Sequence, residues 1–420
     1  MLTVYSCFIQ IYGWAINLLA LSGNEKAKQW INGRRTNTKR SVKKSVWIHC
    51  ASLGEFEQAY PVIEEIQQQF LSNNIIVSFF SPSGYDIVSQ KNVVDDVVYL
   101  PLDTRKNAVE FIDLINPEIA IFVKYEFWFN HLIELKNRNI KTYFISVIVT
   151  KNHFLFGSFS KSFRRVLKST EGMFVQDENS KNLLLNAGFE NIHLSGDTRF
   201  DRVFKFTIKE KDDFKIEKFK SVNSLIVVGS SWKREEKMMN EFIMQTELML
   251  NCRIVIAPHD ISEKHLVKIE QLFNKSIVRY SNYSNQVADI MLIDNIGLLS
   301  SIYRYADIAF VGGGFTNALH NILEPAAYGV PVIYGNNHAK FPEALELEEA
   351  GGGKSVANSA EFIKYVKRLL NDDLFCSEVG QNSLQFILEK IGATDLIMKK
   401  VFKQKLHRLR RKELSIATMN

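Results

Sequence analysis

The stretch that decides the fold is residues 320–331, HNILEPAAYGVP. Asn321 is a favourable N-cap, Glu324 follows three residues later as in a capping box, and Pro325 falls in the first helical turn. A Gly-Val-Pro sequence ends the helix, and the apolar run Val330–Tyr334 resumes as a strand. Free N–H groups at a helix start bind anions. The pattern predicts an α/β sheet with a phosphate site at one edge, although an ordinary capped helix has the same signature.

Length and composition indicate a folded protein of two domains. The chain has 420 residues, of which 46% are hydrophobic and 23% charged, and this length exceeds that of one ordinary core. The four cysteines are scattered, without metal-type or Cys-x-x-Cys spacing. The pattern predicts a reducing compartment, no structural zinc and no disulfide among Cys7, Cys50, Cys252 and Cys376.

Short apolar runs alternate with helical patterns in two series. The first series is Val46–Cys50, Ile75–Phe80, Val97–Leu100, Ile119–Val123, Lys141–Val147 and Met173–Gln176. The second is Ser224–Val228, Arg253–Ala257, Ile290–Ile293, Asp307–Val311 and Val330–Tyr334. Such alternation predicts parallel, doubly wound sheets. We expect two Rossmann-like domains, residues 46–203 and 224–400, that face each other across a cleft, with residues 204–223 as the linker.

The N-terminal segment Met1–Leu21 contains no charged residue and is just long enough to cross a bilayer. It can also lie in the membrane interface, and a buried helix of the globular body is the third interpretation. The basic residues follow the apolar stretch, which argues against a cleaved signal peptide and predicts that the rest of the chain stays in the cytoplasm. We therefore expect residues 1–45 to form an apolar anchor helix with a basic juxtamembrane segment.

The net charge of +6 is unevenly distributed. Asn24–Val46 and Lys399–Glu413 each hold eight Lys or Arg and one Glu, and the remainder carries a net charge of −8. Basic ends favour a membrane surface with anionic lipids. No basic motif interleaved with aromatic residues indicates nucleic-acid binding, so none is expected. Residues 401–420 are predicted to be a basic tail.

Three charged residues in the first half follow predicted strands. Glu55 follows the first strand and Glu126 follows the strand Ile119–Val123, so both carboxylates are expected at one sheet edge. Glu55 is a candidate general base, although a Glu also simply favours a helix N-terminus. Arg199 follows the last strand of this half and can reach anionic substrate groups.

The second half has further polar or glycine-rich strand exits at Ser230–Trp232, Pro258–Asp260 and Gly312–Gly314. Glycines at a strand exit let a backbone approach a ligand closely, but the Gly-x-Gly-x-x-Gly spacing is missing. The chain also has no P-loop, His-Glu-x-x-His or Gly-x-Ser-x-Gly element. ATPases, zinc proteases and serine hydrolases are therefore disfavoured.

Taken in order, these elements resemble the bacterial lipid A Kdo transferases, which move 3-deoxy-D-manno-octulosonic acid (Kdo) from CMP-Kdo to a lipid A precursor, lipid IVA. The resemblance runs over nearly the whole chain, and its motifs are the apolar N-terminus with its basic follow-on, Ser52–Glu55, Glu126–Asn130, Gly196–Asp201, Phe310–Gly313 and Asn321–Ala327. It implies a GT-B fold, inverting transfer without a metal or other cofactor, and attachment to the cytoplasmic face of the inner membrane. It makes no prediction of the oligomeric state.

The resemblance also implies roles for individual residues. Glu55 matches the catalytic base of the family, and Glu126 and Arg199 match positions that stabilise the transition state. The segments that match the CMP-binding elements contain Pro258, His259, Ile296, Gly297, Leu298, Asn321, Ile322, Leu323 and Glu324.

Several positions depart from the family pattern. His259 replaces a usual Arg, Leu298 replaces a usual Glu, Ile148 lies where Arg is frequent, and Arg199 replaces a common Lys. Ala318-Leu319 stands in place of the usual Gly-Gly. These departures affect the CMP contacts most, so two alternatives stay open. One is a GT-B transferase that uses another activated sugar such as a UDP-sugar, and the other is a membrane-attached nucleotide-sugar-binding protein without turnover.

Overall fold

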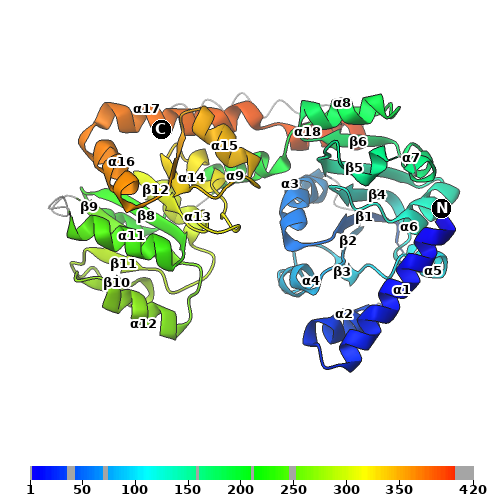
Figure 1. Cartoon of the computed structure of the whole chain (residues 1–420), viewed down its shortest axis with the longest axis horizontal. Helices are drawn as coiled ribbons and strands as arrows, with labels where there is room; N and C mark the ends of the chain where they lie inside the picture. Colours follow the sequence, from blue (N-terminus) through cyan, green and yellow to red (C-terminus); the bar gives the residue numbers. More distant parts are fainter. Residues whose placement is uncertain are drawn as a thin grey trace. The chain divides into compact units, whose positions relative to one another are not determined.

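The chain forms two compact units, each built on a seven-stranded parallel sheet (Figure 1). The computed structural model describes residues 2–35, 43–69, 74–157, 160–209, 212–245 and 252–402. Unit 1 takes in Met1–Arg202 and Gly392–Asn420, and unit 2 takes in Val203–Ile391. The prediction of two doubly wound parallel sheets is confirmed.

The sheet of unit 1 has the strand order β3-β2-β1-β4-β5-β6-β7. Its strands are β1 (Ser45–Cys50), β2 (Asn74–Phe79), β3 (Asp96–Tyr99), β4 (Pro117–Val123), β5 (Lys141–Val147), β6 (Gly172–Val175) and β7 (Ile192–Leu194). The first six lie within two residues of the predicted runs. The edge strand β7 was not predicted, because three residues are too few to show a strand pattern.

Alternation along the strands of unit 1 builds a core on each face of the sheet. In β1, Val46 and Ile48 pack on one face and Trp47 on the other. The first face is covered by α3 (Leu53–Gln69), α4 (Pro82–Val88) and α18 (Ala393–Val401). The second is covered by α5 (Arg105–Ile115), α6 (Phe129–Asn137), α7 (Lys161–Leu167) and α8 (Glu178–Asn186), with the short η1 (Phe154–Phe156) beside them. Both faces are therefore buried, which explains the nearly continuous apolar runs.

Unit 1 begins with two helices, α1 (Leu2–Leu21) and α2 (Glu25–Arg35). Among the described residues, α1 is the one helix long and apolar enough to cross a membrane; over Val4–Leu21 its mean hydropathy is 1.5 and 11% of the segment is buried. Part of the basic segment after it, residues 36–42, and the predicted basic tail from residue 403 onward lie outside the described residues.

The sheet of unit 2 has the order β10-β11-β9-β8-β12-β13-β14. Its strands are β8 (Ser224–Ser231), β9 (Cys252–Pro258), β10 (Ile277–Arg279), β11 (Ile290–Leu292), β12 (Ile308–Val311), β13 (Val332–Gly335) and β14 (Gly353–Val356). The helices are α10 (Phe214–Lys220), α11 (Lys233–Met244), α12 (Glu263–Leu272), α13 (Leu299–Ile302), α14 (Leu323–Ala327), α15 (Pro342–Glu349), α16 (Ser359–Asn371) and α17 (Asp373–Lys390), with short turns η4 (Tyr280–Asn282) and η5 (Tyr303–Tyr305).

Most of the described residues in the expected linker, 204–223, are helical. The segment holds the end of α9 (Thr198–Lys209) and α10, and Ile216 and Phe219 of α10 are buried in the core of unit 2. The apolar side chains of α10 recur at helical spacing, so the helix is amphipathic. The many Lys and Glu residues between them hid this pattern in the sequence.

The C-terminal boundary also differs from the expected 224–400 domain, because α18 belongs to unit 1. Ile397, Met398 and Val401 of α18 pack in the core beside α3. The carboxylate of Asp201 accepts the backbone N–H groups of Gly392 (2.5 Å) and Thr394 (2.7 Å) at the start of α18. A contact between residues this far apart along the chain has no local sequence signal.

The Asp201→Ala variant should loosen α18. The two N–H groups and the Thr394 hydroxyl lose their acceptor, which costs about 1–2 kcal/mol of stability. Limited proteolysis with mass spectrometry should show faster cleavage near residue 392 than in wild type. Asp373→Ala, an exposed first-turn change in α17, is the matched control. Equal cleavage rates in the two variants would contradict the assignment.

Candidate active site

The predicted carboxylates lie at the point in unit 1 where the strand order reverses. From β1 the chain runs to β2 on one side, and β4 then pairs with β1 on the other side. Ligands of doubly wound sheets bind beyond the carboxyl ends of such strands. Glu55 lies in the first turn of α3, directly after β1, and Glu126 lies between β4 and α6. The structure thus brings Glu55 and Glu126 to one edge.

Glu55 is a buried carboxylate, with 7% of the residue exposed. Its Oε2 accepts the backbone N–H of Ala51. Burial, reinforced by the charge of Glu126, raises the pKa of Glu55 to about 7, although the Ala51 N–H and the ammonium of Lys124 oppose the shift. Near neutral pH, Glu55 is therefore able both to hold and to release a proton, as a general base requires.

Behind Glu126 lies a buried polar contact that the sequence reasoning missed. The Trp128 indole N–H donates to Nε2 of His49 over 2.9 Å, and Nδ1 of His49 lies 2.8 Å from the Ser78 hydroxyl oxygen. Nε2 of His49 is also 3.8 Å from Oε2 of Glu126. Because Nε2 accepts from Trp128, the hydrogen-bond network assigns the imidazole proton to Nδ1. Burial lowers the pKa of His49, which keeps the ring neutral. The sequence feature that could have revealed this contact is His49, a histidine within the largely apolar run of β1.

Arg199 is held against the helix that carries Glu55. Its Nε donates to Asp197 Oδ2 over 2.7 Å, and its backbone N–H donates to Asp197 Oδ1 over 2.9 Å. Nε2 of Gln58, one helical turn after Glu55, lies 3.3 Å from both carboxylate oxygens of Asp197. The side chain of Arg199 is 33% exposed. The guanidinium of Arg199 can therefore still reach a ligand. Asp197, which Gln58 contacts in turn, holds the Nε end of the side chain in place.

In unit 2 the strand order reverses between β8 and β12. A Cβ at Gly312 would lie 2.1 Å from the carbonyl oxygen of Ser230, and one at Gly314 would lie 2.4 Å from the backbone nitrogen of Gly335. We expected these glycines to let the backbone approach a ligand. Instead, Gly312 and Gly314 let neighbouring strand ends pack against each other.

Three rings gather beside this point. The Trp232 ring stacks on His259 with centroids 4.6 Å apart and an interplanar angle of 11°, and His259 lies 4.9 Å from the ring of His320. His259 is exposed at the end of β9, whereas Pro258 before it is buried in the strand. Burial and then the neighbouring His259 lower the pKa of His320. The predicted residue His259 is thus part of an exposed aromatic and imidazole surface.

The predicted capping box at Asn321 differs in detail. The helix α14 is only Leu323–Ala327 and has Ile322 at its N-cap position. The Asn321 Oδ1 still accepts the N–H of Leu323 (3.1 Å), but the Glu324 carboxylate accepts from the Asn321 side-chain amide (3.0 Å) and not from its backbone. A helix of five residues has little macrodipole. The prediction of a capping box with Asn321 at the N-cap is therefore wrong, whereas the phosphate site stays a prediction; Asn321, Ile322, Leu323 and Glu324 lie at the carboxyl edge of the sheet.

The last predicted segment, Ile296–Leu298, lies in the loop between β11 and α13. Ile296 is 87% exposed, and Gly297 has a φ of +97°, a left-handed conformation that favours glycine. Leu298 packs on the core below the sheet. The hydroxyl of Ser300, two residues further, donates to Glu324 over 2.7 Å. This hydrogen bond links two of the segments that match the CMP-binding elements, the one at Ile296–Leu298 and the one at Asn321–Glu324.

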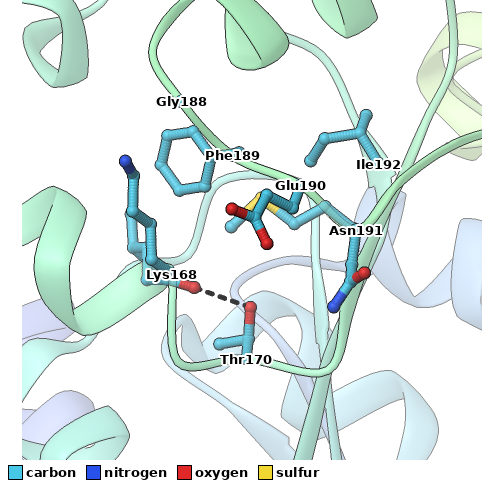
Figure 2. A pocket seen from close by; sticks show the side chains of 9 residues that line it. Lys168, Thr170, Gly188, Phe189, Glu190, Asn191 and Ile192 are labelled. Atoms are coloured by element: carbon cyan, nitrogen blue, oxygen red, sulfur yellow. Dashed lines mark hydrogen bonds between the residues drawn. The ribbon is translucent and has the colours of Figure 1, made fainter.

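A separate cavity of about 170 Å³ lies elsewhere in unit 1 (Figure 2). Lys168, Phe189 and Glu190 line it, together with Met173 near the start of β6 and Ile192 at the start of β7. It therefore lies at the amino ends of the strands, opposite the edge of Glu55 and Glu126. Its volume is below that of ordinary small-molecule sites, and no group of three or more metal-ligating side chains occurs among the described residues.

The raised pKa of Glu55 is testable through stability. Because the folded protein binds this proton more tightly than the unfolded chain, wild type loses stability as the pH rises from about 4.5 to about 7. Glu55→Gln keeps an acceptor for Ala51 and has no proton to lose. It should become more stable than wild type, by up to about 3 kcal/mol at pH 8 in urea unfolding.

The exposed variant Glu118→Gln, on β4, is the control and should show no trend between pH 5 and 8. If the difference in unfolding free energy between Glu55→Gln and wild type stays constant over this range, the pKa of Glu55 is that of an ordinary exposed carboxyl.

Comparison with known proteins places these features in a family. Residues 26–202 match the model of the 3-deoxy-D-manno-octulosonic-acid transferase N-terminal domain. The 3-deoxy-D-manno-octulosonic acid transferase of Aquifex aeolicus is 27% identical over 79% of this chain and 88% of its own length. A bifunctional glycosyltransferase/methyltransferase of Fusobacterium nucleatum is 27% identical over 83% of this chain, which spans only 56% of that longer protein.

Solved structures agree on the fold. The UDP-GlcNAc 2-epimerase of Neisseria meningitidis has a TM-score of 0.60 at 15% identity, covering 86% of this chain and all of that one. MurG of Acinetobacter baumannii has a TM-score of 0.54 at 12% identity, covering 86% of this chain and all of that one. Together these comparisons show that residues 26–202 form a 3-deoxy-D-manno-octulosonic-acid transferase domain, in a glycosyltransferase of GT-B fold that is similar over most of its length to 3-deoxy-D-manno-octulosonic acid transferases.

Proposed function

We propose that this chain transfers Kdo from CMP-Kdo to a lipid A precursor on the cytoplasmic face of the inner membrane, in lipopolysaccharide synthesis. The matched transferase domain and the similar transferases support the class of reaction. The observation that carries the proposal is the buried Glu55, whose pKa of about 7 arises beside Glu126 at the strand-order reversal of unit 1.

In this mechanism Glu55 is the general base. It takes the proton of a glucosamine hydroxyl while that oxygen attacks the anomeric carbon of Kdo. The new bond forms between the acceptor oxygen and the anomeric carbon, and the bond from that carbon to the phosphate oxygen of CMP breaks. CMP leaves with the electron pair, and a single displacement inverts the anomeric centre.

Arg199 and Glu126 stabilise charge in the same step. Glycosyl transfer passes through a transition state with oxocarbenium character, and the Glu126 carboxylate favours that positive charge. The guanidinium of Arg199, positioned through Asp197, attracts the carboxylate of Kdo or the leaving phosphate. Such fixed charges act without a metal ion, and we propose that none is required.

The donor nucleotide binds unit 2 in this proposal. The stacked Trp232 and His259 offer a flat surface for the base, and His320 lies beside them. The Glu324 carboxylate accepts hydrogen bonds from Ser300 and Asn321, and in this proposal it also accepts from the ribose hydroxyls. His259 supplies here the contact for which most of the family uses an Arg.

The transfer reaction is the direct test. With CMP-Kdo, tetraacyl lipid A precursor, detergent and EDTA, wild type should form product, and mass spectrometry should count the added sugars. Glu55→Gln should be at least about 100-fold slower, because a positioned base contributes that much, while calorimetry shows unchanged CMP binding. Glu118→Gln should match wild type. Near-wild-type turnover of Glu55→Gln would exclude Glu55 as the base, and restoration by Mg²⁺ of activity lost in EDTA would exclude a metal-free mechanism.

Nucleotide competition separates the two alternatives kept open by the sequence. CMP should bind purified protein, UDP should compete poorly, and His259→Ala should weaken CMP about tenfold through loss of the ring contact. Val287→Ala, an exposed change in the same unit, is the control. Preference for UDP would indicate another activated sugar, and CMP binding without product from any acceptor would indicate a binding protein.

A further inference from the structure

One face of α1 is fixed to the body of unit 1 over most of the helix. The Tyr5 hydroxyl donates to Asp103 Oδ2 over 2.5 Å, and the Tyr5 ring packs edge-on against Phe129 with centroids 5.3 Å apart. Ile9 and Ile16 are only 6% and 8% exposed. These three residues follow helical spacing, so they define an inner face that spans three turns.

The fit between α1 and the body is close. A Cβ at Gly13 would lie 2.6 Å from the side chain of Leu102, so the helix backbone approaches the body at this turn. The start of α1 lies beside α6, through the contact of Tyr5 with Phe129, and Figure 1 shows that its end is joined to α2. The Arg34 guanidinium of α2 donates to the carbonyl of Phe80 over 2.8 Å, which holds the second helix to the same unit.

The opposite face of α1 exposes a row of large apolar side chains. Seven of them are between 52% and 85% exposed: Val4, Phe8, Ile11, Trp14, Leu18, Leu19 and Leu21. We call these residues the outer stripe. A contiguous exposed stripe of this size marks an interaction surface.

Charge identifies the partner as a lipid surface. The outer stripe carries no charge, and the segment that follows it, Asn24–Val46, has eight basic residues and one acidic residue. Lys26 and Lys28 in α2 are exposed. An apolar helix face followed by basic residues suits a leaflet with anionic headgroups.

The inner contacts decide how α1 meets that leaflet. A helix of 20 residues is about 30 Å long, which equals the hydrocarbon thickness of a bilayer. A spanning α1 would therefore use its whole length and would have to release Tyr5, Ile9 and Ile16 from unit 1. We propose that α1 lies in the membrane plane, with its outer stripe in one leaflet and its inner face still bound to unit 1. The inference extends the proposed function, whose acceptor is a membrane lipid.

This arrangement places the leaflet next to the candidate acceptor edge. Asp103, the acceptor for Tyr5, also accepts the backbone N–H groups of Asn130 (3.1 Å) and His131 (3.0 Å) at the start of α6. That start follows Glu126 by only three residues. The headgroup of a glycolipid held in the same leaflet would therefore lie beside the loop that carries Glu126.

Depth measurement distinguishes an in-plane helix from a spanning one. Val4, Ile11 and Leu18 are seven residues apart, so they share one face and are separated by about 10 Å along the axis. Each is replaced by Cys in a full-length background with Cys7→Ser and Cys376→Ser, and labelled with an environment-sensitive fluorophore. Cys50 and Cys252 are buried. The proteins are bound to phosphatidylethanolamine and phosphatidylglycerol vesicles that contain lipids with quenchers at defined depths.

We expect equal, shallow depths at all three positions, and no quenching at a Val222→Cys control, which is 98% exposed in unit 2. A label at position 11 that lies about 10 Å deeper than those at 4 and 18 would overturn the proposal in favour of a spanning helix. Absence of quenching at all three, with a shift to dimer in solution, would overturn it in favour of a second copy of the chain. Because neither donor nor acceptor is added, the result is independent of the proposed transfer reaction.

Discussion

The direction shared by the parallel strands is the constraint on which the rest of this structure depends. In unit 1 it brings the residues after β1 and β4 to one edge, and in unit 2 it does the same for β8 and β12. Glu55 and Glu126 are 71 positions apart in the sequence but follow neighbouring strands. A site assembled in this way needs no local motif, because the topology brings its parts together.

The same edge sets the electrostatics of the carboxylates. Glu55 is buried and near a like charge, and both effects favour its protonated form. The Ala51 N–H and Lys124 limit the shift, so the pKa stays near neutrality. His49, beside Glu126, is held neutral by burial and by its acceptor role toward Trp128. The two carboxylates therefore share an edge but differ in their surroundings: Glu55 accepts from the backbone N–H of Ala51, and Glu126 lies 3.8 Å from the imidazole of His49.

Local patterns predicted the two sheets well, because buried parallel strands such as β4 contain uninterrupted apolar runs. They failed where the determining contact is distant in sequence. Glu324 was expected to close a capping box with Asn321, but its carboxylate accepts from Ser300 of α13 as well as from the side-chain amide of Asn321. The edge strands β7, β10 and β14 were missed because they are short and each contains a polar residue, His193, Arg279 or Lys354, that breaks the apolar run. His49 and Trp128 were not recognised as a pair, since nothing along the chain indicates which strand exit a buried histidine meets.

Asp103 shows how a buried charge couples distant parts of unit 1. Burial alone would raise its pKa, yet hydrogen bonds from His131 and Tyr5 hold the pKa of Asp103 below its usual range. An ionised carboxylate without exposure is tolerated only when its oxygens are fully used, and here the donors come from α1 and from the start of α6. Displacing α1 would remove the Tyr5 hydroxyl as a donor to Asp103. It would thereby weaken the contact between Asp103 and the start of α6. The position of the loop that carries Glu126 is therefore tied to the helix that carries the outer stripe, so in the proposed arrangement the helix that faces the leaflet also fixes that loop.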